Sequence, residues 1–364
     1  MEETDIAIIG AGPIGIELAA RLKSDGLDYV HVEAGDLGAT MGWWAPGTKY
    51  FSSPERIQIA GVSLVTPRED KATREQYRDY LRQVVATHEL NVRTNTRVVG
   101  ARKHNDHFIL ELAPSTHGVG GVEELTGNGT FTPGLNLRAK RVVLAIGNMH
   151  QPRRLDIPGE DNPFVSHYMP DPHACYNQKV LIVGGRNSAV EAAIRLYRVG
   201  ADVHLSYRRN EFSERIKPWL KPELEWLISK GRITFYPETE VTDLRRGLDN
   251  PVRAEIRPIS GADPEHHGFD RVLLMTGYVQ DTELFEWLNV ELGDEPECRP
   301  RINPKTHESR SQPGVYVAGT ACGGSQSRAR FFIETCHVHV DKIAAHLQGS
   351  IADVEDPVFE LEEN

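Results

Sequence analysis

The sequence has no long apolar run and no surplus of positive charge. Its longest apolar stretches, such as Ile6 to Ile9 and Val142 to Ile146, are far too short to cross a bilayer. Lysine and arginine number 41 against 52 aspartate and glutamate residues, which gives a formal net charge of -11. Nucleic acids and anionic membranes select basic surfaces, so neither is an expected partner.

Cysteines are few and scattered. They are Cys175, Cys298, Cys322 and Cys336, and no two of them form a CxxC pair or match zinc-ligand spacing. The acidic N-terminus, MEETD, runs directly into an apolar strand, which is not the pattern of a secretory signal. We therefore expect reduced thiols in a cytoplasmic protein.

A chain of 364 residues has room for two domains, and two stretches have the same pattern of strand, glycine turn and helix. The first is Asp5 to Glu33 and the second is Lys179 to Arg209. The fold class predicted is α/β, with two Rossmann-like domains, the second inserted into the first. We expect the first domain to comprise residues 1–158 and 290–364, and the second to comprise residues 159–289.

Other segments fill the first domain. Thr73 and Gln76 have the spacing of a capping box before a helix. The stretch from Pro114 to Leu137, rich in Gly, Thr and Ser, is predicted to form a long hairpin or surface loop. A strand at Val315 to Ala318 and a helix at Arg330 to Leu347 close the chain, and we expect both to return to the first sheet.

The first glycine turn has the GxGxxG pattern of a dinucleotide site. Gly10 allows the tight turn, Gly12 lets a pyrophosphate approach the backbone, and Gly15 lets the helix pack close to the strand. Glu33 ends the next strand, where an acid accepts hydrogen bonds from ribose hydroxyls and repels a 2′-phosphate. This turn therefore predicts FAD or NAD rather than NADP.

The second glycine turn departs from the pattern. Arg186 stands where the middle glycine would be, and we expect its side chain to point outward and pair with the pyrophosphate. Arg208 and Arg209 follow the next strand, where a 2′-phosphate would lie, and guanidinium groups bind phosphate in a bidentate manner. This turn therefore predicts NADPH. The residues expected at NADPH are Gly184, Gly185, Arg186, Asn187, Ser188, Arg208, Arg209 and Gly277.

Two further segments end buried strands in small residues, which lets the backbone pass close to a flat cofactor. One contains Ala145 and Gly147, and the other contains Gly277. The residues expected at FAD are Gly10, Gly12, Pro13, Ile14, Gly15, Glu33, Val98, Ala145, Gly147, Gly319 and Thr320.

These motifs together resemble the flavoproteins with two dinucleotide-binding domains, the superfamily of thioredoxin reductase. Tyr207 to Phe212 resembles the basic NADPH motif of that group, and Val315 to Gly319 resembles its C-terminal flavin motif. The chain is more closely similar to the bacillithiol disulfide reductase (YpdA-like) family. The stretches that carry this similarity are Phe51 to Ile57, Gly184 to Ala189, Ile216 to Trp219 and Phe332 to Glu334.

The resemblance implies FAD, NADPH and the reduction of a low-molecular-weight thiol disulfide, with dimers common in the superfamily. Two residues depart from it. Thr320 stands where an acid usually follows the glycine of the flavin motif, which weakens a hydrogen bond to the ribityl chain. Ile14 stands where the family has its proposed redox cysteine, so that role cannot be transferred.

The electron acceptor is therefore open. A small disulfide is favoured, reduced through Cys322 or directly from the flavin. The alternatives are electron transfer of the ferredoxin- or flavodoxin-NADP reductase type to a small redox protein, a flavin monooxygenase, and a non-catalytic dinucleotide sensor. His337 and His339 are two residues apart and face different directions on a helix, so no metal site is expected.

Overall fold

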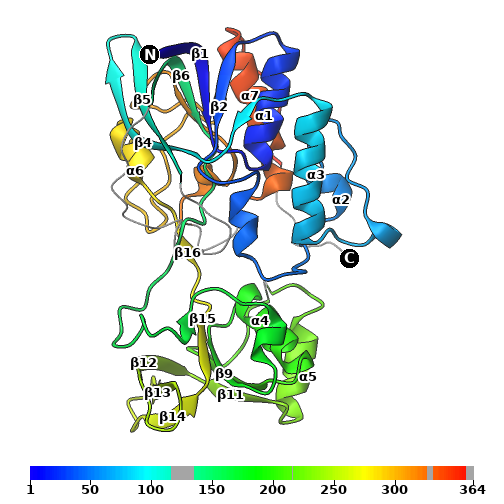
Figure 1. The fold of residues 1–364 in the computed structure, drawn as a ribbon, viewed down its shortest axis with the longest axis vertical. Coiled ribbons are helices and arrows are strands. Elements are labelled where there is room, and N and C mark those ends of the chain that lie inside the picture. The colour runs from blue at the N-terminus through cyan, green and yellow to red at the C-terminus, as the bar shows by residue number, and fades with distance from the viewer. Residues whose placement is uncertain (116–134, 215, 326–330, 358–364) are drawn as a thin grey trace. The chain divides into compact units, whose positions relative to one another are not determined.

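The computed structural model describes residues 1–115, 135–214, 216–325 and 331–357. They form two compact units, drawn in Figure 1. Unit 1 comprises Met1–Trp43, Lys49–Gln151 and Tyr278–Asn364, and unit 2 comprises Trp44–Thr48 and Pro152–Gly277. The predicted loop at Pro114 to Leu137 lies largely outside the described residues.

The sheet of unit 1 is parallel at its centre. Strands β3, β2, β1 and β6 run parallel in this order, β17 also pairs with β6 in parallel, and β5 and β4 continue the sheet in antiparallel register. The strands are β1 (Glu2–Ile9), β2 (Tyr29–Val32), β3 (Val92–Arg93), β4 (Thr96–His104), β5 (His107–Pro114), β6 (Leu135–Leu144) and β17 (Val315–Val317). The expected return of the last strand to the first sheet is confirmed.

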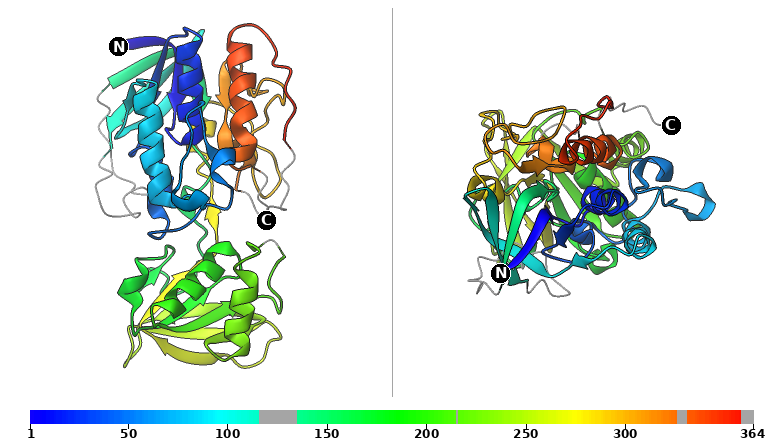
Figure 2. Two further views of the ribbon diagram at one scale, coloured as in Figure 1. Left: turned by 90° about the vertical axis from the view of Figure 1, so that its right-hand side faces the viewer. Right: turned by 90° about the horizontal axis from the view of Figure 1, so that it is seen from above.

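Three longer helices accompany this sheet. Helix α1 (Pro13–Ser24) contacts both α3 (Arg74–Thr87) and α7 (Ile333–Leu347), and Figure 2 shows it between them. Thr73 and Gln76 form the predicted capping box at the start of α3. Short helices complete the unit: η1 (Ala39–Trp43), α2 (Pro54–Ile57), η2 (Pro67–Glu69), α6 (Glu283–Trp287) and η5 (Gly319–Gly323).

Unit 2 repeats the arrangement on a smaller scale. Its parallel sheet has the order β11, β10, β9, β15, β8. These strands are β8 (Val165–Ser166), β9 (Lys179–Val183), β10 (Asp202–Tyr207), β11 (Ile233–Pro237) and β15 (Arg271–Leu274). The helices are η4 (Pro172–Cys175), α4 (Asn187–Arg198) and α5 (Lys221–Ser229), and an antiparallel sheet adds β12 (Thr239–Arg245), β13 (Val252–Pro258) and β14 (Glu265–Phe269).

The chain passes from one unit to the other at different residues from those expected. Leu155 and Ile157 pack on the apolar core of unit 2, which also contains Leu244 of β12, so residues after 151 belong to unit 2 rather than unit 1. Phe285 and Leu288 are buried in the core of unit 1, so residues after 277 return to it before residue 290. The crossing strands β7 (Gln151–Pro152) and β16 (Tyr278–Val279) pair with each other.

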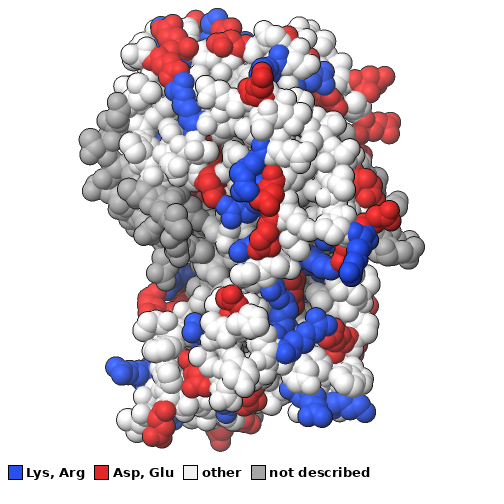
Figure 3. All heavy atoms as spheres, turned by 45° about the vertical axis from the view of Figure 1, so that its right-hand side comes forward, with Lys and Arg blue, Asp and Glu red and all other residues white. Residues whose placement is uncertain are grey.

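Charge is spread over the surface. On the face drawn in Figure 3, acidic and basic side chains are interspersed and do not gather into one extended basic patch. None of the helices in the described residues combines the length and apolar character that a membrane span needs.

Candidate dinucleotide sites

The glycines of the first turn differ in whether the surrounding protein leaves room for a side chain. A Cβ added to Gly10, whose φ is +104°, would lie 2.5 Å from the carbonyl oxygen of Ala145, and one added to Gly15 would lie 2.0 Å from the carbonyl oxygen of Gly10. The fold itself therefore requires both. Gly12 caps α1 with φ −75°, and a Cβ there would meet no atom within 4 Å. The protein's own packing therefore does not require a glycine at this position.

Glu33 ties this turn to the end of β2. Its carboxylate accepts hydrogen bonds from the main-chain N–H groups of Ala11, at 2.6 Å, and Gly35, at 2.8 Å. Burial raises the pKa of Glu33, and these two N–H groups oppose the rise because they favour the charged form. The acid predicted to bind ribose thus also fixes the backbone beside the glycine turn.

Three segments predicted to bind FAD converge at the first turn. A Cβ on Gly15 would lie 3.3 Å from Cβ of Ala145, and a Cβ on Gly319 would lie 3.4 Å from Cβ of Ile14. A Cβ on Gly147 would lie 3.8 Å from Oγ1 of Thr320. Residues far apart in the sequence therefore surround the N-terminus of α1, where free N–H groups favour an anion such as pyrophosphate.

Two other expected FAD residues have clear structural roles. Pro13 occupies the first turn of α1, where its missing N–H costs nothing. Val98 lies in the edge strand β4 beside an irregularity in pairing between Val98 and Gly100, and its side chain is buried in the apolar core. Only the backbone of Val98 is therefore left to meet a ligand.

The second glycine turn follows the same logic in unit 2. A Cβ on Gly184, whose φ is +143°, would lie 2.5 Å from the carbonyl oxygen of Met275, and one on Gly185 would lie 2.4 Å from the Tyr207 ring. Arg186 caps α4 with φ −113°, a backbone conformation open to any residue. Its side chain is exposed, in keeping with the outward orientation expected from the sequence.

The charge of Arg186 in this turn is affected by three other arginines. Partial loss of hydration lowers the pKa of Arg186; Tyr207 opposes this, while Arg208, Arg209 and Arg153 lower the pKa further. Arg208 and Arg209 directly follow β10 and are exposed. Repulsion among clustered guanidinium groups is relieved by a bound polyanion, so the arrangement fits a phosphate-bearing ligand.

The other residues expected at NADPH differ in whether they already make contacts within the protein or are free to meet a ligand. The Asn187 side chain accepts a hydrogen bond from the N–H of Lys217 at 2.8 Å, so it already holds the loop before α5. Ser188 is exposed on the first turn of α4. Gly277, with φ +98°, has open space where a Cβ would lie, and its carbonyl accepts from the N–H of Arg153.

Cys322 does not have the surroundings of a reactive thiol. Its side chain is buried, and burial raises its pKa well above the ordinary value, with Cys336 adding to the rise. Reactive cysteines need the thiolate and access to solvent. The catalytic role considered for Cys322 is therefore disfavoured by its position, although it does follow the predicted flavin motif in η5. Cys336 and Cys175 are also buried, and Cys298 is exposed.

Sequence reasoning considered His337 and His339 of unit 1 only as a metal pair, and it missed His31 and His307. His31 is buried beneath the first turn, with Nε2 2.9 Å from the carbonyl oxygen of Gly10. His307 and His339 lie against the Cys322 sulfur, although 15 and 17 residues separate them from it in sequence. His31 lies inside the apolar strand Tyr29 to Val32, and a histidine within such a strand was the signal available for it.

A family model describes chains of this kind. The pyridine nucleotide-disulphide oxidoreductase model matches residues 7–117 and 130–319. The chain belongs to this family. Bacilliredoxin reductase Bdr of Bacillus subtilis (strain 168) is 31% identical over 343 residues, which cover 93% of this chain and 96% of that protein.

Other members of the family extend the comparison. The solved structure of bacillithiol disulfide reductase Bdr (YpdA) from Bacillus cereus matches with a TM-score of 0.84 and 27% identity, covering 96% of this chain and 99% of that chain. The ferredoxin–NADP reductase of Ignicoccus hospitalis is 32% identical over 212 residues, or 57% of each chain. The resemblance and the two-domain fold predicted from the sequence are confirmed: this member of the pyridine nucleotide-disulphide oxidoreductase family is a FAD-dependent oxidoreductase that uses NADPH.

Proposed function

We infer that the enzyme takes hydride from NADPH onto FAD and delivers two electrons to the disulfide of a small acceptor. The overall reaction balances as NADPH, one proton and a disulfide giving NADP⁺ and two thiols. FAD supplies the hydride acceptor, and the protein supplies binding and orientation. The acceptor is either a low-molecular-weight disulfide or a small redox protein.

One observation supports this proposal above the others. The position of Gly12 is open although the fold does not require a glycine there, and the segments of Ile14, Ala145 and Gly319 meet around it. A site of this kind holds a pyrophosphate at a helix N-terminus. Glu33, at the end of β2, would then bind the ribose, and the backbone of Thr320 would meet the ribityl chain.

In unit 2, we propose that the pyrophosphate of NADPH lies at the start of α4 beside Gly184, Gly185 and Ser188. Arg186 would pair with the pyrophosphate from outside, and Arg208 and Arg209 would bind the 2′-phosphate. The charges of Arg208 and Arg209 both lower the pKa of Arg186, and this mutual repulsion supports the assignment, since a shared polyanion would relieve it.

The acceptor is proposed from the relatives. One relative is named a bacilliredoxin reductase and another a bacillithiol disulfide reductase, and the second name specifies a low-molecular-weight disulfide. In this chain Ile14 is buried against Gly319, so no thiol stands at the position of the family cysteine. With Cys322 buried as well, we propose that the disulfide is reduced without a mixed disulfide to the enzyme. We further propose a cytoplasmic location, which suits the free cysteines, exposed Cys298 included.

A second function is supported by the same residues. A ferredoxin-type NADP reductase needs no enzyme thiol, and Ile14 and buried Cys322 suit it as well. The match to a ferredoxin–NADP reductase covers 57% of this chain, against 93% for the bacilliredoxin reductase, so disulfide reduction is the stronger proposal.

The test records the visible absorption spectrum of the bound flavin under anaerobic conditions. The purified protein is expected to be yellow and to bleach on addition of NADPH, faster than with NADH. The reduced protein is then mixed with bacillithiol disulfide, glutathione disulfide, cystine, or oxidised ferredoxin or flavodoxin, and the return of colour is timed. Fast return with one disulfide, undiminished in Cys322→Ser, supports the proposal. Fast return only with the one-electron protein carriers contradicts it and supports the second function.

A further inference from the structure

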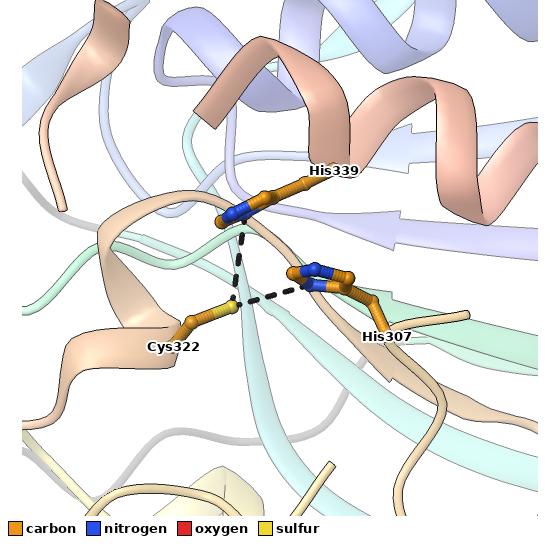
Figure 4. Close-up of side chains that lie close together, drawn as sticks. All are labelled: His307, Cys322 and His339. Carbon is orange, nitrogen blue, oxygen red and sulfur yellow. Dashed lines mark hydrogen bonds between the residues drawn. The ribbon is translucent and has the colours of Figure 1, made fainter. Parts of the chain in front are cut away.

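We propose that His307, Cys322 and His339 form a buried zinc site in unit 1. Figure 4 shows both imidazole rings next to the sulfur of Cys322. The sulfur lies 3.6 Å from Nδ1 of His307 and 3.8 Å from Nδ1 of His339. All three donor atoms lie within 4.8 Å of one another. This proposal concerns a position that neither FAD nor NADPH is assigned to, and it is independent of the acceptor.

The separations match what zinc imposes. Zinc binds thiolate sulfur at about 2.3 Å and imidazole nitrogen at about 2.0–2.1 Å, so tetrahedral angles put sulfur and nitrogen about 3.5 Å apart. The observed separations of 3.6 and 3.8 Å are close to this distance. The two imidazole rings lie next to each other, with centroids 4.0 Å apart and a tilt of 37°.

The donors suit a borderline-soft metal. Two imidazoles and a thiolate favour zinc over magnesium or calcium, which prefer oxygen ligands. The carbonyl oxygen of Val317 lies 3.0 Å from Nδ1 of His307 and 3.3 Å from the Cys322 sulfur, where it can serve as a fourth donor. Two imidazoles, a thiolate and a backbone carbonyl would give zinc four protein ligands, which corresponds to a closed structural site rather than a catalytic one.

Zinc would bind the thiolate of Cys322 and a lone pair of each neutral imidazole. The thiol must give up one proton, which leaves as zinc–sulfur bonding replaces the S–H bond. Nearby Lys342 is paired with Asp356 at 2.5 Å, so its charge is balanced.

Zinc must displace contacts that the side chains now make. Nδ1 of His307 donates its proton to the Val317 carbonyl at 3.0 Å, so zinc binding must move that proton to Nε2. Nδ1 of His339 accepts the N–H of Gly319 at 3.1 Å, and the Cys322 thiol donates to the Val317 carbonyl at 3.3 Å. Metal bonds and these hydrogen bonds exclude each other, because they use the same lone pairs and the thiol proton. The hydrogen-bonded network without metal is therefore the specific alternative that an experiment must separate from the zinc site.

The site would join three segments of unit 1. His307 belongs to the loop before β17, Cys322 to η5 after β17, and His339 to α7, so zinc would clamp the end of β17 and the turn at Gly319. All three side chains are at most 4% exposed, so the ion would enter during folding rather than by exchange in the native state.

The experiment measures zinc bound on folding. Untagged protein is unfolded in guanidinium with a chelator, refolded with FAD and excess zinc, freed of loose metal, and analysed for zinc and copper. About one zinc per chain is expected for the wild type and for Cys336→Ser, whose cysteine is equally buried in α7. Cys322→Ser and His307→Asn are expected to fall to less than a tenth of that content.

A second measurement does not depend on a variant that folds. X-ray absorption at the zinc edge of the wild type is expected to show one sulfur at about 2.3 Å and nitrogen or oxygen neighbours at about 2.0–2.1 Å. Wild-type protein that refolds without zinc, carries copper instead, shows no sulfur neighbour, or keeps its zinc in Cys322→Ser would overturn the assignment and leave the hydrogen-bonded network in place.

Discussion

The N–H of Ala11, in the middle of the first glycine turn, donates a 2.6 Å hydrogen bond to the carboxylate of Glu33 at the end of β2. Glu33 thus closes the turn from the neighbouring strand, and its second oxygen accepts from Gly35. A residue predicted to bind ribose is in addition part of the architecture that holds the glycine turn.

Replacing Glu33 should therefore affect both stability and FAD. Glu33→Ala leaves two N–H groups without their acceptor, and each loss of this kind costs about 1–3 kcal/mol. Glu33→Gln keeps one acceptor oxygen and should lose less. Urea unfolding of the FAD-free protein measures the first effect, and flavin content after purification measures the second. Equal stability of Glu33→Ala and wild type would contradict the structural role.

Gly12 and Gly10 form a matched pair of substitutions. In Gly12→Ala the added methyl group meets no protein atom, so the FAD-free protein should unfold at the same urea concentration as wild type, yet FAD affinity should fall more than tenfold. Gly10→Ala forces a Cβ onto the Ala145 carbonyl and should destabilise the fold itself. Titration of FAD into both proteins, with unfolding curves, separates the two effects. Normal FAD affinity in Gly12→Ala would place the pyrophosphate elsewhere.

The choice between NADPH and NADH should rest on Arg208 and Arg209. Charge-assisted hydrogen bonds contribute about 1.5–3 kcal/mol, so removing both side chains should lower the NADPH to NADH ratio of kcat/KM by about tenfold to a hundredfold. Arg198→Ala is the control, because Arg198 is an exposed arginine of unit 2 paired with Glu223. A ratio that does not change in the double variant would remove the 2′-phosphate assignment.

Thiol reagents should distinguish the four cysteines by burial. In the native protein Cys298 should react readily, while Cys175, Cys322 and Cys336 should resist until the chain unfolds. Peptide mass spectrometry after a brief exposure to iodoacetamide reports the labelled positions, with a guanidinium-unfolded sample as the control. Rapid labelling of Cys322 would show a thiol that solvent reaches and would reopen its catalytic role.

His31 should make the first unit sensitive to acid. Burial lowers the pKa of His31 to about 4, so between about pH 4 and 6.5 the unfolded chain binds a proton that the folded one does not. Stability should therefore fall as pH drops through this range, by up to about 3 kcal/mol at its lower end. His31→Gln can still donate to the Gly10 carbonyl but does not titrate. Unfolding curves of both proteins at pH 7 and pH 4.5 should show the smaller decline in the variant.

Local signals in the sequence predicted the framework well. The Thr73 and Gln76 capping box lies where its spacing placed it, and the strand beginning at Val315 returned to the first sheet. Such signals succeed because a cap or a glycine turn depends on residues only a few positions apart. The two-domain fold class follows because the pattern of strand, glycine turn and helix occurs twice in the sequence.

Contacts between distant residues were not predictable in the same way. No spacing rule brings His307, Cys322 and His339 together, because the loop before β17, η5 and α7 meet only through packing around the sheet. The expected boundaries between the two units differ from those in the structure for the same reason. Leu155 and Phe285 pack into cores formed by strands that lie far from them in the sequence. Burial of Cys322 likewise depends on neighbours that its own segment does not specify.

The return of β17 to β6 has a consequence for the order in which the protein is made. Unit 2 is synthesised completely by residue 277 and contains all strands of its own sheets, whereas unit 1 still lacks β17 and α7 at that moment. Domains generally fold as units while the ribosome extends the chain. The inserted unit can therefore mature first, and the earliest residues to leave the ribosome, those of β1 and α1, wait for the latest before their own unit is complete.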